Sequence, residues 1–169
     1  MRVRDKILGW KALKARVEEW KKKGLTIVFT NGCFDILHIG HIRYLEAAKE
    51  YGDRLIVAIN SDESVRAIKG DKRPLVPQGE RAEIIAALSF VDCVTIFDQP
   101  TPLSLIEYIL PDVLVKGSDW PEDKIVGSKI VIAHGGRVIR IPQIEGASTS
   151  ILIDRVLKRY CKSALDNMG

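Results

Sequence analysis

Two histidines, His38 and His41, are separated by Ile-Gly at the end of the stretch 30–41. A short run of mainly apolar residues, 26–30, precedes them and reads as a buried strand. A segment with helical spacing follows them and ends near Gly52. In α/β proteins ligands bind where a strand ends and a helix begins, and helix N-termini attract anions. The stretch therefore predicts a phosphate site with two imidazoles directed into it.

Three further segments combine cations, glycines and hydroxyl groups. They are residues 69–73 (Lys-Gly-Asp-Lys-Arg), 116–120 (Lys-Gly-Ser-Asp-Trp) and 145–150 (Glu-Gly-Ala-Ser-Thr-Ser). If the strands before them are parallel, all three lie at the same sheet edge as the histidines. This content suits a bound polyphosphate, although the sequence has neither a Walker A motif nor G-x-G-x-x-G.

Each feature also has a simpler explanation. The histidines with Cys33 and Asp35 could hold zinc, although their spacing does not match a zinc finger, and Asp35 could instead cap the turn. The cations of residues 69–73 could be solvated loop charges, and Ser148 could be only a helix N-cap. Convergence at one edge is what favours a phosphate site over these alternatives.

The elements that must position these residues alternate along the chain. Strands are expected at 26–30, 54–60, 91–97, 113–116 and 137–141. Helices are expected at 3–24, 42–52, 61–67, 78–88, 102–110, 126–134 and from 148 onward. Strands alternating with helices over short loops predict βαβ units, joined by right-handed crossovers. The expected fold is a doubly wound, Rossmann-like three-layer α/β sandwich with a five-stranded parallel sheet.

Two of the expected helices have readable apolar faces. The first is amphipathic, is ended by Gly24, and carries Ile7, Trp10, Leu13, Val17 and Trp20 on one face. Helix 78–88 is expected to turn Ile84, Ile85 and Leu88 toward the core. The expected division is an N-terminal helix at 1–24 packed on the domain, the domain itself at 25–162, and a C-terminal tail at 163–169.

Composition excludes several classes of protein. The chain has 169 residues, 46% apolar and 28% charged, which suits one globular domain. No apolar run is long enough to span a bilayer, and no signal-peptide pattern follows the basic start, so a cytoplasmic protein is expected. The net charge is +4, but the basic stripe with interleaved aromatics typical of nucleic-acid binders is missing.

The three cysteines, Cys33, Cys93 and Cys161, are odd in number and widely spaced, which argues against disulfides. Cys93 and Cys161 are expected to be small buried hydrophobes.

These residues resemble a known family. Residues 32–41 are similar to the signature of the cytidylyltransferase-like nucleotidyltransferases, whose hallmark is His-x-Gly-His, and residues 146–150 resemble the Gly-x-Ser-Thr that opens their last helix. Blocks 69–74, 111–117 and 135–139 are similar to the adenylyltransferase half of bacterial ADP-heptose synthesis enzymes. The resemblance covers nearly the whole chain.

The resemblance implies transfer of AMP from ATP to D-glycero-D-manno-heptose 1-phosphate, giving ADP-heptose, a lipopolysaccharide core precursor, and pyrophosphate. Cytidylyltransferase relatives place an arginine before Thr-Glu-Gly, where this chain has Gln143, Ile144 and Glu145. That difference favours ATP over CTP. The alternatives are a cytidylyltransferase acting on glycerol 3-phosphate or a related polyol phosphate, and a nucleotide-binding regulator without turnover.

The resemblance also implies roles for particular residues. Catalytic roles fall on His38, His41 and Lys69. Nucleotide contacts fall on Cys33, Phe34, Asp35, Gly40, His41, Lys116, Gly117, Asp119, Gly146, Ser148, Thr149 and Ser150. Contacts to the sugar phosphate fall on Asn31, Lys69 and Arg73.

Partners follow from the same resemblance. Mg²⁺ is expected to bridge the ATP phosphates, with no protein ligand assigned to it. A homodimer fits the family, no nucleic acid or membrane partner is expected, and a heptose kinase is expected on a separate chain.

Overall fold

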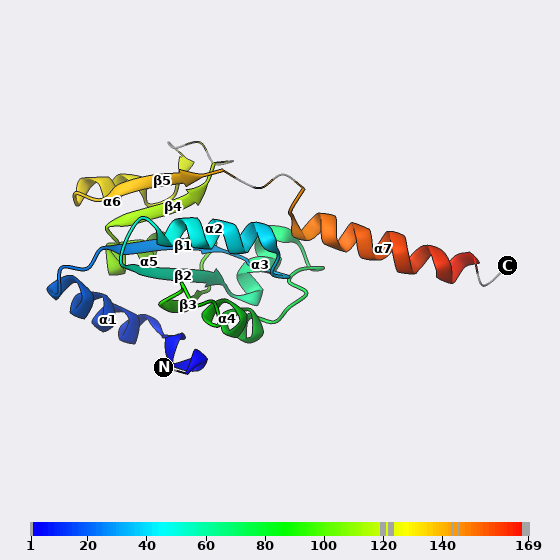
Figure 1. Cartoon of the computed structure of the whole chain (residues 1–169), viewed down its shortest axis with the longest axis horizontal. Helices are drawn as coiled ribbons and strands as arrows, with labels where there is room; N and C mark the ends of the chain where they lie inside the picture. Colours follow the sequence, from blue (N-terminus) through cyan, green and yellow to red (C-terminus); the bar gives the residue numbers. More distant parts are fainter. Residues whose placement is uncertain (1, 119–120, 122–123, 143, 145, 167–169) are drawn as a thin grey trace.

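The computed structural model describes residues 2–118, 121, 124–142, 144 and 146–166, and for 162–166 only the backbone. Its sheet contains five strands in the order β3-β2-β1-β4-β5, and every pair is parallel (Figure 1). The strands are β1 (Ile27–Gly32), β2 (Arg54–Asn60), β3 (Cys93–Phe97), β4 (Val113–Gly117) and β5 (Arg137–Ile141). The expected five-stranded parallel sheet is confirmed.

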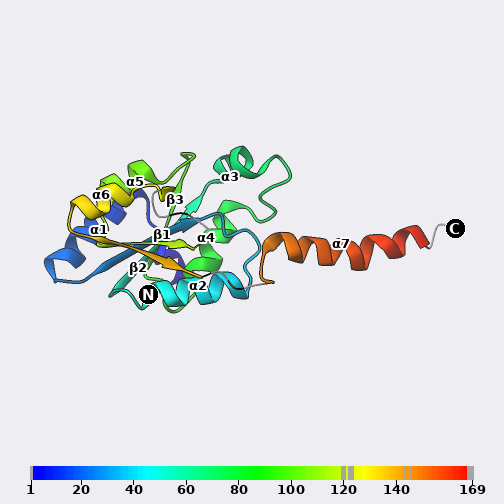
Figure 2. The ribbon, with the colours of Figure 1, turned by 90° about the horizontal axis from the view of Figure 1, so that it is seen from above.

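Helices cover both faces of the sheet. The described α-helices, of which α7 does not lie on the sheet, are α1 (Trp10–Lys22), α2 (Ile39–Lys49), α3 (Asp62–Lys69), α4 (Gln78–Ala86), α5 (Leu103–Ile109), α6 (Ser128–Ala133) and α7 (Thr149–Asp166). Helices α1, α5 and α6 lie on one face of the sheet, and α2 and α4 lie on the other (Figure 2). Side chains of the first three share one buried cluster, and side chains of the other two share the second. The doubly wound, three-layer architecture is therefore confirmed.

The central strands feed both clusters because successive side chains of a strand point to opposite faces. On β1, Val28 packs with α2 and α4, whereas Phe29 packs with α1 and α5. Both side chains are fully buried. Strands buried on both faces carry nearly continuous apolar runs, which is why β1 and β2 were recognisable in the sequence.

The N-terminal segment differs from the single helix expected over 3–24. A short 3₁₀ helix, η1 (Val3–Lys6), comes first, and α1 begins only at Trp10. Between them Ile7 forms a parallel bridge with Val94, and the Leu8 N–H donates to the Val94 carbonyl at 2.9 Å. Pairing with the edge strand β3 thus replaces helical hydrogen bonds at this point. Gly24, with φ of 72°, follows the end of α1.

Three smaller expectations were wrong. On α4, Ile84 is 42% exposed rather than buried, whereas Ile85 is buried as expected and Arg81, a charged residue, is buried beside it. Cys161 is exposed rather than buried, whereas Cys93 is fully buried as expected. Helix α5 begins at Leu103, so Pro102 is its N-cap residue and not its first helical residue.

Helix α7 extends away from the rest of the domain in both views (Figures 1 and 2). Its backbone stays helical to Asp166, which includes part of the segment expected as a tail. Several of its apolar side chains are exposed, Ile151 by 41%, Val156 by 55% and Leu157 by 52%, whereas Leu152 and Ile153 are partly buried. Within the described residues, no helix is long and apolar enough to span a membrane.

Candidate functional site

A cavity of about 580 Å³ opens at the carboxyl edge of the sheet. Its floor comes from the ends of β1, β2 and β4, represented by Gly32, Asn60 and Lys116. Strand β2 lies on one side of β1 and β4 lies on its other side, so the order of the strands reverses at β1. Crevices at such a reversal of strand order are where open α/β sheets bind ligands.

All four loops singled out in the sequence contribute to this cavity. Its lining includes Asn31, Cys33, Phe34, Asp35, His38, Gly40, His41, Lys69, Arg73, Lys116, Gly117, Ser148, Thr149 and Ser150. Gly146 has a positive φ of 74° but does not line the cavity. Asp119 lies outside the described residues. The structure therefore brings the predicted residues together, apart from these two.

The two histidines lie side by side at the start of α2. Their ring centroids are 3.8 Å apart and their planes differ by 25°. The ring of Phe34, a buried side chain, makes an edge-type contact with the His41 ring, with centroids 5.2 Å apart and planes 63° apart. His38 immediately precedes α2 and makes no side-chain capping bond. Both imidazoles are thus held in the cavity wall next to the N-terminal turn of a helix.

Both imidazoles are neutral at pH 7. Burial, and to a smaller extent the neighbouring His38, lower the pKa of His41 to about 4, although Asp35 acts weakly in the opposite direction. Burial also lowers the pKa of His38. The Nδ1 atoms of both rings are buried, with no hydrogen-bond partner in the described part of the chain. Buried polar atoms without partners are uncommon and costly, so these rings suit a polar ligand.

Gly40 is required by close packing at this point. A Cβ at this position would lie 3.0 Å from Cε1 and Nδ1 of the His38 ring and 3.2 Å from Cβ of Ala147. These contacts are tighter than is usual for a Cβ, so the imidazole or Ala147 would have to shift by a few tenths of an ångström to admit one.

Cations approach the cavity from two sides. Lys69 is the last residue of α3, and Lys116 extends from β4 with its Nζ 3.5 Å from the Asn31 carbonyl oxygen. Arg73 also lines the cavity, but its Nε donates to the Asp35 carboxylate at 2.5 Å. The lysines are therefore well placed to attract phosphate groups, whereas Arg73 is already engaged in an ion pair.

Asp35 is a structural anchor of the loop that follows α3. Its side chain is fully buried and accepts from the Leu75 N–H at 2.9 Å and the Val76 N–H at 2.9 Å, besides Arg73. Burial alone would raise the pKa of Asp35, but these hydrogen bonds and the Arg73 guanidinium together lower it.

The hydrogen bonds of Asp35 affect whether its carboxylate could bind the expected Mg²⁺. Among the described residues, no three His, Cys, Asp or Glu side chains gather as a metal-binding group. Among the described residues that line the cavity, the acidic side chain is that of Asp35, and its carboxylate is already bonded to the loop. The described side chains do not form a protein-ligated Mg²⁺ site.

The start of α7 forms another wall. The Ser148 hydroxyl accepts from the Ile151 N–H at 3.2 Å, and the Thr149 hydroxyl donates to the Asp35 carbonyl at 2.7 Å. The N-cap interpretation of Ser148 is thus confirmed. The first N–H groups of a helix lack partners within it, so the beginning of α7 offers donors to an anion in the cavity.

Some lining residues were not predicted. Tyr44 lies three residues after His41 on α2; its hydroxyl is 2.7 Å from the Thr30 hydroxyl and donates to the Val115 carbonyl at 3.2 Å. Its helical spacing from His41 is a signal that would have found it. Asn60, at the end of β2, donates to Ser64 at 2.9 Å. Lys124 lines the cavity too, but no pattern in the sequence distinguishes it.

The fold and the site define an α/β domain whose cavity, at the carboxyl edge of a parallel sheet, is lined by two stacked histidines, by lysines and by the start of a helix. A family model described as cytidylyltransferase-like matches residues 29–155, so the chain belongs to the cytidylyltransferase-like family.

Individual relatives agree with this assignment. The chain is 50% identical to the bifunctional protein HldE of Geobacter metallireducens over 155 residues, and 48% identical to that of Syntrophotalea carbinolica over 156. Each alignment covers 92% of this chain but 32% of the relative, so the chain spans about a third of the length of these proteins.

Solved structures show the same fold. The lipopolysaccharide core biosynthesis protein from Thermoplasma volcanium superposes with a TM-score of 0.61 at 28% identity, covering 72% of this chain and all (100%) of that one. A pantoate-beta-alanine ligase from Francisella tularensis gives a TM-score of 0.55 at 17% identity, covering 80% of this chain and 66% of that one, a likeness of fold alone.

Proposed function

We propose that this chain transfers an adenylyl group from ATP to D-glycero-D-manno-heptose 1-phosphate, releasing pyrophosphate and forming ADP-heptose. The carrying observation is the stacked pair of neutral imidazoles, His38 and His41, at the start of α2 in the wall of the cavity. Membership of the cytidylyltransferase-like family and the similarity to HldE proteins support the proposal.

In this reaction the sugar phosphate oxygen attacks the α-phosphorus of ATP, and the bond to the pyrophosphate oxygen breaks. The attacking oxygen is already anionic, so no strong general base is needed. Catalysis then rests on positioning and on stabilising the charge that moves to the leaving group. His38 and His41 donate ring N–H groups to phosphate oxygens as this charge develops.

The remaining residues divide between the two substrates. Lys116 and the N-terminal turn of α7, from Ser148 to Ser150, bind the ATP phosphates, together with the backbone of Cys33 and Phe34. Lys69 binds the phosphate of the sugar and Asn31 contacts the same substrate. Arg73 contributes charge near Lys69 while it stays paired with Asp35.

The described side chains form no site for Mg²⁺, so an ion that took part would be held by the substrate and by water, and it would neutralise phosphate charge. This agrees with the preference of Mg²⁺ for oxygen ligands and its tendency to retain several waters. A preceding kinase reaction supplies the sugar 1-phosphate. The protein acts in the cytoplasm. It acts there as a homodimer, and sedimentation at micromolar concentration tests this oligomeric state.

Pyrophosphate release tests the proposal. ATP, CTP, GTP and UTP are each paired with heptose 1-phosphate and with glycerol 3-phosphate, and the His41→Ala variant measures background release. Release with ATP and heptose 1-phosphate alone is expected. Release with CTP and glycerol 3-phosphate would replace the proposal with a cytidylyltransferase. Nucleotide binding with no release in any pair would replace it with a regulator that binds without turnover.

A further inference from the structure

Arg81, on α4, is the largest fully buried side chain among the described residues, with 1% of its surface exposed. Arginine is almost never buried so completely unless it is paired. No role was expected for it, because a charged residue on a helix is normally assigned to the solvent face. Its burial therefore requires an explanation from its partners.

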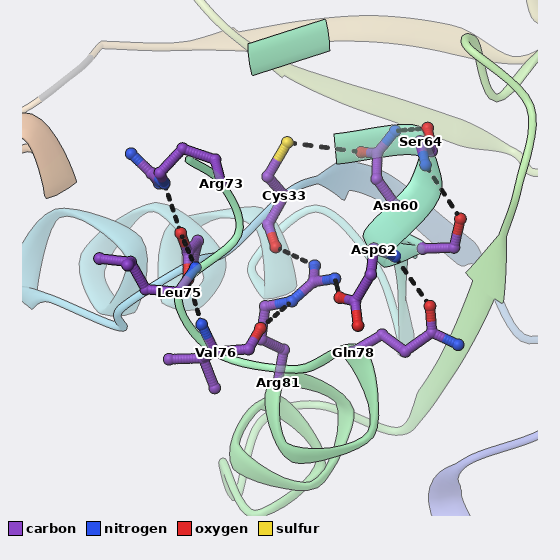
Figure 3. Close-up of polar contacts among 11 residues, drawn as sticks. Cys33, Asn60, Asp62, Ser64, Arg73, Leu75, Val76, Gln78 and Arg81 are labelled. Carbon is purple, nitrogen blue, oxygen red and sulfur yellow. Dashed lines mark hydrogen bonds and ion pairs between the residues drawn. The ribbon is translucent and has the colours of Figure 1, made fainter. Parts of the chain in front are cut away.

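The guanidinium of Arg81 joins three separate segments (Figure 3). Its Nη1 donates to the Cys33 carbonyl at 2.5 Å, its Nη2 to Oδ1 of Asp62 at 2.7 Å, and its Nε to the Val76 carbonyl at 2.9 Å. These acceptors belong to the turn between β1 and α2, to the first turn of α3 and to the loop before α4.

The turn that receives the first of these bonds is strained. Phe34 and Ile36 have φ angles of 47° and 52°, in the left-handed region that side chains other than glycine seldom occupy. Such conformations persist only where the surroundings impose them. The turn leads directly into His38, so its conformation sets where both imidazoles lie.

Contacts from outside the turn hold this conformation on each side of Phe34. Arg81 holds the Cys33 carbonyl before it. After it, Asp35 is held through its carboxylate by the Leu75 and Val76 N–H groups and through its carbonyl by Thr149. Arg81 also donates to the Val76 carbonyl, so Arg81 and Asp35 both couple the turn to the loop that carries Arg73.

We propose that Arg81 is a positioning residue, which fixes the strained turn between β1 and α2 and thereby places His38 and His41 in the cavity. The consequence for catalysis rests on the proposed function; the placement of the rings does not. Lysine cannot replace it, because an ammonium presents its three donors from one atom, whereas the guanidinium reaches three acceptors with a planar fork.

The NMR resonances of the histidine rings measure whether His38 and His41 keep their positions. The chain has three, and His134 lies exposed on the far end of α6, bonded to the Ile130 carbonyl. In the folded Arg81→Lys variant, the ring resonances of His38 and His41 in NMR spectra shift, while those of His134 stay unchanged. Its kcat with ATP and heptose 1-phosphate falls on the order of 10²-fold, as misplacement of catalytic groups does.

Arg54→Lys is the matched control. Arg54 pairs with Asp92 at 3.0 Å at the opposite end of β2, so this variant leaves all three sets of resonances and the kcat unchanged. A folded Arg81→Lys protein with unchanged His38 and His41 resonances would overturn the inference. Shifted resonances with a wild-type kcat would overturn its catalytic part.

The test also covers a variant that does not fold and a wild-type protein that is inactive. If Arg81→Lys does not fold, Asp62→Ala removes one of the three acceptors, and the same two histidines shift by a smaller amount; no shift overturns the proposal. The spectra need no substrate, so a wild-type protein inactive toward heptose 1-phosphate would refute the proposed function and leave the placement of the rings still tested.

Discussion

The imidazole rings of His38 and His41 stack 3.8 Å apart at the start of α2. Two charged rings at this distance would repel each other, and burial already disfavours the charge on each. The unliganded pair is therefore neutral. An anion bound beside the rings would favour protonation, so we expect nucleotide binding to raise the pKa of at least one of them.

His41→Ala removes the more deeply placed ring. We expect kcat to fall about 10²-fold or more, the usual effect of losing one preorganised donor to developing charge. Steady-state pyrophosphate release measures this. The control is His134→Ala, on α6 outside the cavity, for which wild-type turnover is expected. Equal turnover in wild type and His41→Ala would remove His41 from the mechanism.

Gly40→Ala tests the close approach in the cavity wall. The new Cβ would lie 3.0 Å from the His38 ring, so we expect the ring to move and kcat to fall at least about tenfold. Gly79→Ala, near the start of α4, is the matched control, because its Cβ would meet nothing within 4 Å. It should keep full turnover and raise the free energy of unfolding by about 0.5 kcal/mol.

The sheet, the helices on both faces and the meeting of four loops at one edge could be predicted from the sequence. They depend on apolar runs in β1 and β2, on glycines that end helices, and on the carboxyl-end rule for parallel strands. These are local signals or general rules of topology, so one sequence is enough to read them.

What escaped prediction depends on contacts between distant segments. Arg81 is buried because Cys33, Asp62 and Val76 converge on it from three places, and side-chain type alone assigns such a residue to solvent. Ile84 was assigned to the core for the same reason and lies exposed. The break near Ile7 likewise arises from pairing with β3, which no local propensity encodes.

The stability of the folded protein should fall as the pH is lowered from about 6.5 to about 4. The His41 pKa is about 4 in the folded state, against an ordinary value of 6.5, so the unfolded chain binds its proton first on acidification. The stabilisation is complete above pH 6.5 and is lost through this window, by about 2–3 kcal/mol from His41. Denaturant unfolding at several pH values measures it.

His41→Gln isolates this contribution, because glutamine does not titrate. Its free energy of unfolding should change less between pH 7 and pH 4 than that of the wild type. The Asp35 pKa is lowered from 3.8, so its contribution is lost below that value, outside the window. Parallel pH curves for the two proteins would contradict the assignment.

Asp35→Asn breaks the anchor of the loop that follows α3. The amide leaves Arg73 without its anion and supplies one acceptor oxygen where the carboxylate supplies two to Arg73, Leu75 and Val76. We expect a loss of about 3 kcal/mol in the free energy of unfolding, as when one partner of a buried ion pair is removed. Asp154→Asn disrupts an exposed pair with Lys158 and should cost less than about 0.5 kcal/mol.

Lys69 and Lys72 lie three positions apart in the sequence but differ in their relation to the cavity. Both are exposed lysines, yet Lys69 lines the cavity and Lys72 does not. Changing each to methionine removes the same charge and keeps a side chain of similar length. We expect Lys69→Met to lower kcat/KM for the sugar phosphate at least about tenfold, because a phosphate loses its cation, and Lys72→Met to change it less than about twofold. Equal losses in the two variants would mean that the loop acts through its general positive field, in which case raising the ionic strength should abolish the effect of both.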